Sequence, residues 1–121
     1  MMKTLLFIFT LILTVSFSFS QESATVKSPS DLTSIKESGK GFITLPSKLT
    51  KDEVASKAKY YNLYFTVDFD EKSKLATINM VDNSERSRMI IVRFLAGCEV
   101  QTINVAGDIV NRDQLFEKYL K

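Results

Sequence analysis

Residues 63–81 read LYFTVDFDEKSKLATINMV, and the fold class follows mainly from this stretch. Apolar and polar side chains alternate along residues 63–69, which predicts a half-buried β-strand. The polar residues 70–73 predict a turn, and the alternation resumes along residues 74–81. The stretch therefore predicts an antiparallel hairpin with one face on a core and the other toward solvent.

Helical patterns flank the hairpin on both sides. Thr50 and Glu53 form a capping box that predicts a helix start at Thr50. Residues 85–96 carry a wide apolar stripe at helical spacing, which predicts a helix packed deeply against a sheet. Gly97 follows this helix where a C′ glycine is common.

The remaining elements complete an α+β order. Strands are predicted at residues 42–45 and 100–105, and a last helix at residues 113–120. The order β-α-β-β-α-β-α predicts a ferredoxin-like βαββαβ plait, which is a four-stranded antiparallel sheet with two helices on one face. The last helix is an addition to that plait. The inward positions predict a core centred on Phe65, Val67, Ile78, Met89, Val92, Leu95 and Ile103.

The N-terminal segment has the three regions of a secretory signal peptide. Lys3 supplies positive charge, residues 5–15 are apolar, and Ser18 and Ser20 suit a cleavage site before Gln21. The apolar run is shorter than the ~20 residues of a membrane-spanning helix. We therefore predict a secreted or periplasmic protein with no membrane contact after cleavage between Ser20 and Gln21. A Gln directly after such a signal resembles exported proteins of Bacteroidota.

Residues 21–40 separate the signal peptide, residues 1–20, from the predicted domain, residues 41–121. They are rich in Ser, Thr and charged residues. A short helix is predicted over residues 31–37, but this helix has little apolar surface of its own. The segment therefore predicts a flexible linker.

Composition excludes several chemistries. The chain has 121 residues, a formal net charge of +2, no His and one Cys. This small net charge gives no electrostatic case for nucleic acid. Activation of a nucleophile by His is excluded, although a Ser–Lys pair is not. We predict no catalytic residue, no cofactor and no bound metal, and we predict Cys98 to be a small buried hydrophobe.

Three segments resemble the second half of a heavy-metal-associated (HMA) domain: residues 65–71, 75–80 and 86–97. The resemblance covers about residues 41–105 and implies a ferredoxin-like fold. The family binds a soft metal through Cys-x-x-Cys between the first strand and the first helix. Residues 46–50 take that place here and contain neither Cys nor His, the ligand types that soft metals need. The resemblance supports the fold and argues against the metal.

The outward positions of the predicted strands are mostly neutral and polar, and only Asp68 among them is charged. Threonine is a good strand former, so this composition also has an ordinary structural explanation. The functional interpretation is an interaction face made by Thr44, Tyr64, Thr66, Thr77, Asn79, Thr102 and Asn104. Its partner would be a protein, a glycan or a second copy of the chain.

We therefore predict a small exported, non-enzymatic binding module. One alternative is a derivative of a heavy-metal (copper-type) carrier that has lost its loop ligands. Another is a domain similar to a protease-inhibitor propeptide. The helix predicted at residues 113–120 argues against this last alternative, because such domains end in an extended tail that enters the protease.

Overall fold

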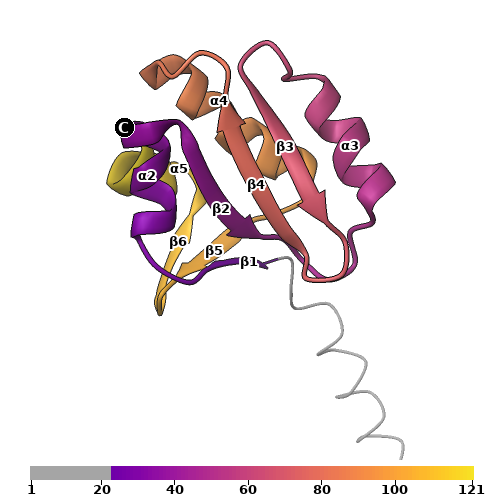
Figure 1. Ribbon diagram of the computed structural model, residues 1–121. Helices are drawn as coiled ribbons and strands as arrows, with labels where there is room; N and C mark the ends of the chain where they lie inside the picture. The colour runs from indigo at the N-terminus through magenta and orange to yellow at the C-terminus, as the bar shows by residue number, and fades with distance from the viewer. Residues whose placement is uncertain (1–22) are drawn as a thin grey trace, which may run out of the picture.

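The computed structural model describes residues 23–121, so the predicted signal peptide lies outside the described residues. The described chain has an α+β fold, as predicted (Figure 1). Its strands are β1 (Ser23–Val26), β2 (Lys40–Thr44), β3 (Phe65–Asp70), β4 (Leu75–Met80), β5 (Thr102–Val105) and β6 (Asp108–Asn111). Its helices are α2 (Ser30–Ser38), α3 (Lys51–Lys59), α4 (Glu85–Gly97) and α5 (Arg112–Leu115), followed by the π-helical turn η1 (Phe116–Leu120). Between residues 23 and 121, no helix is both long and apolar enough to span a membrane.

The strands form one mixed sheet of six strands in the order β3-β4-β2-β1-β5-β6. β1 runs parallel to β5, and the other neighbouring pairs are antiparallel. This sheet differs from the expected four-stranded antiparallel sheet by the addition of β1 and β6. A ferredoxin-like plait places its first and last strands side by side, and here β1 lies between β2 and β5.

The prediction of a flexible linker is wrong from Ser23 onward. Ala24 and Val26 of β1 and Leu32 and Ile35 of α2 are fully buried. Leu32 and Ile35 are three residues apart, so they lie on the same side of the helix. Two apolar side chains are enough to dock a short helix when both face the core. The folded domain therefore includes β1 and does not begin at residue 41.

Gly41 allows α2 to lie very close to the sheet. A Cβ atom added to Gly41 would lie 2.3 Å from the backbone oxygen of Asp31 and 2.3 Å from the Cγ1 atom of Ile35. No larger residue fits at that distance without moving the helix. Gly41 pairs with Ile78 of β4, which is fully buried, so the contact with α2 lies on the core side of the sheet.

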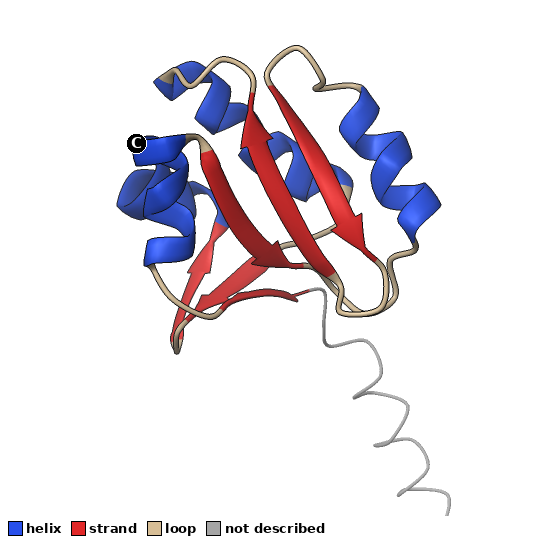
Figure 2. Cartoon of the chain, in the orientation of Figure 1, coloured by secondary structure: helices blue, strands red, loops and turns tan. Residues whose placement is uncertain are grey.

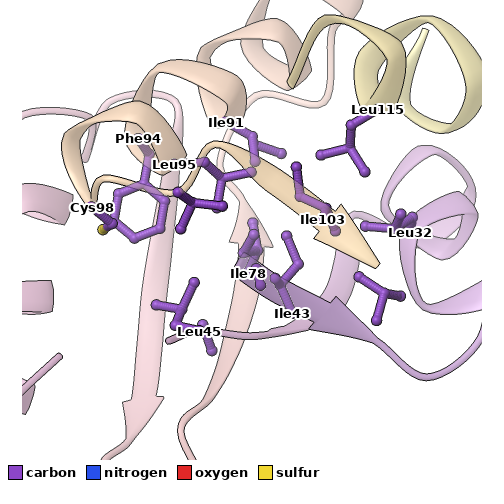
Figure 3. Packing of buried hydrophobic residues seen from close by; sticks show 14 of the residues in the cluster. Leu32, Ile43, Leu45, Ile78, Ile91, Phe94, Leu95, Cys98, Ile103 and Leu115 are labelled. Atoms are coloured by element: carbon purple, nitrogen blue, oxygen red, sulfur yellow. The ribbon is translucent and has the colours of Figure 1, made fainter. Parts of the chain in front are cut away.

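The helices gather on one side of the sheet and leave strands β2, β3 and β4 uncovered on the other (Figure 2). The covered side carries the fully buried residues of the strands. Figure 3 shows strand residues meeting helix residues there: Ile43, Ile78, Ile103, Leu32, Ile91, Leu95 and Leu115. One continuous hydrophobic core therefore joins the sheet to the helices.

Most of the predicted core is confirmed, and one predicted core residue is exposed. Phe65, Ile78, Leu95 and Ile103 are fully buried, whereas Met89 is 47% exposed. The apolar stripe of α4 is wider than the surface that the sheet and its neighbours cover, so a residue at the edge of the stripe stays in solvent. Val67 and Val92 are partly buried against the core.

Leu63, predicted as an inward strand residue, is 79% exposed. β3 begins only at Phe65, because the chain between α3 and β3 forms a turn in which the Tyr64 N–H donates to the Tyr61 carbonyl at 2.9 Å. The ring of Tyr61 stacks on Phe65 with its centroid 6.0 Å away. The hydrophobic contact expected of Leu63 is therefore made by Tyr61.

The predicted helix start at Thr50 is confirmed, but the predicted end of the α4 helix is wrong, and β6 is absent from the sequence prediction. Gly97 was predicted at C′, whereas it lies within α4 and the positive φ of 63° belongs to Glu99. The Thr50–Glu53 capping box starts α3, and a second box of the same kind starts α5. Ala106 and Gly107 have φ angles of 52° and 99°. Two consecutive positive φ angles are typical of the tight turns that join hairpin strands. This turn directs β6 back along β5 and extends the sheet by one edge strand.

Candidate functional site

The sheet surface opposite the helices, which we name the open face, is made by alternate residues of each strand. The strand register fixes which side chains share it, because paired residues lie on the same side. Thr66 pairs with Asn79, and Thr77 pairs with Phe42. A single row crosses five strands through Leu75, Thr44, Thr25, Asn104 and Ile109. The open face is therefore continuous from β3 to β6.

The register brings together six of the seven residues that sequence analysis assigned to an interaction face. They are Thr44, Thr66, Thr77, Asn79, Thr102 and Asn104. Tyr64 lies just before β3 rather than within it, and its half-buried side chain packs against the core. Its carbonyl oxygen accepts hydrogen bonds from the N–H groups of Val81 and Asp82. Tyr64 therefore lies at the open end of the β3–β4 hairpin, outside the open face.

Several residues of the open face were not predicted from the sequence, and three of them lie near its centre. Thr25 belongs to β1, which was predicted as linker. Phe42 and Leu75 are half-buried on the open face, where they pair with Thr77 and Thr44 respectively. The signal for Thr25 was its position between the apolar residues Ala24 and Val26, a pattern too short to predict a strand by itself.

The polar side chains of the open face have unused hydrogen-bonding capacity. Within residues 23–121, none of five threonine hydroxyls on this face makes a hydrogen bond, and neither does the Asn79 amide. The five threonines are Thr25, Thr44, Thr66, Thr77 and Thr102, one on each of five neighbouring strands. The Asn104 side chain, by contrast, accepts a hydrogen bond from the Gly107 N–H at 2.8 Å. Hydroxyl and amide groups both donate and accept, so the open face can contact a ligand that does both.

The open face carries more charge than the sequence predicts. The register adds Lys40, which pairs with Asn79, and Asp70, which pairs with Leu75. Lys40 begins β2 and Asp70 ends β3, so both lie at the margin of the face. The row through Thr44, Thr25 and Asn104 stays uncharged at the centre.

A hollow of about 250 Å³ opens on this face where β1 separates from β2. The two strands share one register pair, Thr25 with Thr44. The hollow is lined by both threonines and by the apolar side chains of Phe42 and Leu75. Three residues of β1, α2 and their connection complete the lining: Val26, Lys27 and Asp31. In the described part of the chain, the Lys27 and Asp31 side chains make neither an ion pair nor a hydrogen bond.

Cys98 is buried, as predicted, and lies on the core side of the molecule (Figure 3). Loss of hydration on burial raises the pKa of its thiol to about 11, although the positive charge of Lys57 acts in the opposite direction. A thiol with a raised pKa is a poor nucleophile at neutral pH, because the thiolate is the reactive form. The burial and the raised pKa of Cys98 therefore argue against a role as a nucleophile at neutral pH.

Hydrogen bonds and an ion pair hold the loop between β2 and α3, which is the position of the metal ligands in the HMA family. The Lys74 ammonium donates to the Leu49 carbonyl at 2.8 Å, and the Glu71 carboxylate accepts from the Lys51 N–H. Lys48 of this loop forms an ion pair with Glu99 at 2.8 Å. Across residues 23–121, no group of three or more Cys, Asp or Glu side chains is placed to hold a metal ion.

No family model, curated protein or solved structure matches this chain. The chemistry of the open face comes from its own side chains: neutral donors and acceptors over most of its area, and a partly apolar hollow at its centre. The arrangement offers shape complementarity and hydrogen bonding to a contacting molecule and little net charge to attract one.

Proposed function

We propose that the protein is an exported, non-enzymatic binding module whose contact surface is the open face of the sheet. The observation that carries the proposal is the set of five threonines on the open face of five neighbouring strands, whose hydroxyls make no hydrogen bond within residues 23–121. Each of these threonines lies opposite, or one pleat away from, a threonine or asparagine of the next strand. A ligand lying across the strands would meet several of them at once.

Two properties of the surface support this proposal over a purely structural explanation. Exposed sheets are usually protected from association by charged side chains, and the central row of the open face has none. Phe42 and Leu75 also place apolar surface on the side away from the core. Solvent-facing apolar groups surrounded by polar ones are typical of binding surfaces.

For the fold, we propose that residues 40–105 are a ferredoxin-like plait of the HMA type into which β1 has been inserted. The element order β2-α3-β3-β4-α4-β5 supports this proposal, and so does the adjacency of β2, β4 and β3. The lack of Cys and His in residues 46–50 favours a contact role for the sheet over metal transport.

We also propose that the protein is exported after cleavage between Ser20 and Gln21, because residues 1–20 have the pattern of a signal peptide. N-terminal sequencing of the protein recovered outside the cytoplasm is expected to begin at Gln21. Recovery of full-length chain from the membrane fraction would contradict this proposal.

Site-specific photocrosslinking tests the contact surface in the producing cell. A photoreactive amino acid replaces Thr77 on the open face, and a matched variant carries it at Ser56, an exposed position of α3 on the helix side. Both variants are first compared with the wild type by urea unfolding to establish that they fold.

We expect crosslinked products from position 77 and few or none from position 56. Mass spectrometry of these products identifies the crosslinked partner as a protein, a glycan or a second copy of the chain. Equal yields from both positions, or no product from position 77, would contradict the proposal that the open face is the contact surface.

A further inference from the structure

The hollow between β1 and β2 gives the open face a specific place for a ligand, and the inference below rests on the proposed function. β1 and β2 share a single register pair, so their backbones separate on both sides of Thr25 and Thr44. The resulting depression of about 250 Å³ is lined by an apolar set of side chains that includes Phe42 and Leu75, which we name the floor, and by a polar set, which we name the rim: Thr25, Lys27, Asp31 and Thr44. It is smaller than the pockets of about 300–1,000 Å³ that enclose drug-sized ligands. The hollow therefore suits a single ring of a larger molecule rather than a whole drug-sized ligand.

The floor of the hollow favours a flat ligand that presents C–H groups. Phe42 and Leu75 line it, and both side chains are half-buried. The face of an aromatic ring carries partial negative charge, so it attracts the partially positive C–H groups of a ring laid across it. Gly41 and Ile43, the neighbours of Phe42, lie on the core side, so the strand alternation holds Phe42 on the open face.

The rim favours a ligand with many hydroxyl groups. Thr25 and Thr44 offer hydroxyls that both donate and accept, Asp31 accepts and Lys27 donates. The charges of Lys27 and Asp31 cancel, so the hollow as a whole does not select a charged ligand. The unpartnered hydroxyls of Thr77 and Thr66 continue the same chemistry across β4 and β3.

From these features we infer that the open face binds a neutral oligosaccharide, with one sugar ring stacked on Phe42 in the hollow. A sugar ring has an apolar face of C–H groups and an edge of hydroxyls, which match the floor and the rim respectively. The next sugar units would lie over the threonines of β4 and β3. An ordinary protein partner matches the surface less well, because most of its contacts would be with exposed hydroxyls rather than with apolar area.

The test uses the purified mature protein, residues 21–121, on an array of neutral, acidic and amino-substituted oligosaccharides. The neutral oligosaccharide that binds best is then titrated into isotopically labelled protein and followed by NMR. We expect binding to neutral members, with little dependence on ionic strength because no net charge is neutralised. The largest amide shifts are expected at Thr25, Phe42 and Thr44.

Variants assign the stacking residue. Phe42→Ala is expected to weaken binding at least about tenfold, as loss of a ring contact and its buried area requires. Phe42→Trp is expected to retain binding because it keeps the aromatic face. Tyr60→Ala is the matched control, because Tyr60 is an exposed aromatic residue at the end of α3. We expect this variant to bind the oligosaccharide with the affinity of the wild type.

The outcomes separate this inference from the proposed function. Absence of binding to every neutral oligosaccharide overturns the inference, whereas a protein crosslinked at position 77 would still support the proposed function. Unchanged affinity of Phe42→Ala together with a loss in Thr77→Lys overturns the hollow as the site and keeps the open face. Binding only to the acidic or amino-substituted oligosaccharides, in a form that high salt abolishes, also overturns the inference. A shift map confined to the helix side contradicts both.

Discussion

The two faces of the sheet use the same strands for opposite purposes. In β3, Phe65 is fully buried while Thr66, the next residue, is exposed. In β4, Ile78 lies in the core while its neighbours Thr77 and Asn79 lie on the open face. The stability of the domain is therefore concentrated on one face, and the other face is free to change its chemistry at little cost.

The largest expected effect on stability comes from removing β1 and α2, because β1 joins the two halves of the sheet. A chain that begins at Gly41 lacks β1 and α2, so it loses four fully buried side chains and separates β2 from β5. We expect no cooperative unfolding transition in urea, whereas the chain that begins at Gln21 unfolds cooperatively. Cooperative unfolding of the shorter chain would show that the β2–β5 part is stable without its central strand.

Phe65→Ala tests the buried face. Phe65 packs edge to face on Phe94 at 5.9 Å and stacks with Tyr61. Removing a fully buried ring of this kind is expected to lower the free energy of unfolding by about 3–5 kcal/mol. Urea unfolding measures the loss. A loss below about 1 kcal/mol, the range of surface changes rather than core changes, would contradict the assignment of Phe65 to the core.

Cys98, on the buried side of the sheet, is expected to make the free energy of unfolding depend on pH. Its pKa is about 11 in the folded chain and 9.0 in the reference state. Between these values the folded chain keeps a proton that the unfolded chain loses, so stability falls as the pH rises. A gap of this size corresponds to roughly 2–3 kcal/mol lost by pH 11.

Other groups also titrate in this range, so the control is the matched variant Cys98→Ala. We expect its stability to fall less steeply than that of the wild type above pH 9. Parallel curves for the two proteins would show that Cys98 contributes nothing to the pH dependence.

Thr66→Ala should give the smallest effect and tests the open face. The Thr66 side chain is exposed and makes no hydrogen bond within residues 23–121. Its replacement is expected to change the free energy of unfolding by no more than about 0.5 kcal/mol. Urea unfolding of Thr66→Ala beside Phe65→Ala tests the register directly, because a slip of one residue exchanges the two faces. Equal losses in the two variants would mean that the open face is covered.

The hairpin and the helix starts could be predicted because their causes are local. Six alternating residues in each of β3 and β4 are enough to define two faces. The Thr50–Glu53 box satisfies its own backbone groups, so it needs no distant partner. The helix end at residues 97–99 was harder to predict, because the left-handed position is taken by Glu99, with φ 63°, and not by Gly97.

The candidate site was predictable only in part. The threonines and asparagines of predicted strands were found by alternation, whereas the hollow depends on β1, whose four residues carry too little pattern to predict a strand. Lys27 and Asp31 reach the hollow through the β1–α2 connection. Their role follows from where that connection lies in space.

The sequence by itself determined the α+β class, the hairpin with its two faces, and the first residues of the longer helices. These features depend on residues close together in the chain. Tertiary structure alone decided that β1 lies between β2 and β5, that α2 docks over Gly41, and that β6 extends the sheet. The physical reason is that each of these short elements buries too few apolar residues to be stable alone, and it becomes ordered through contacts with distant parts of the chain.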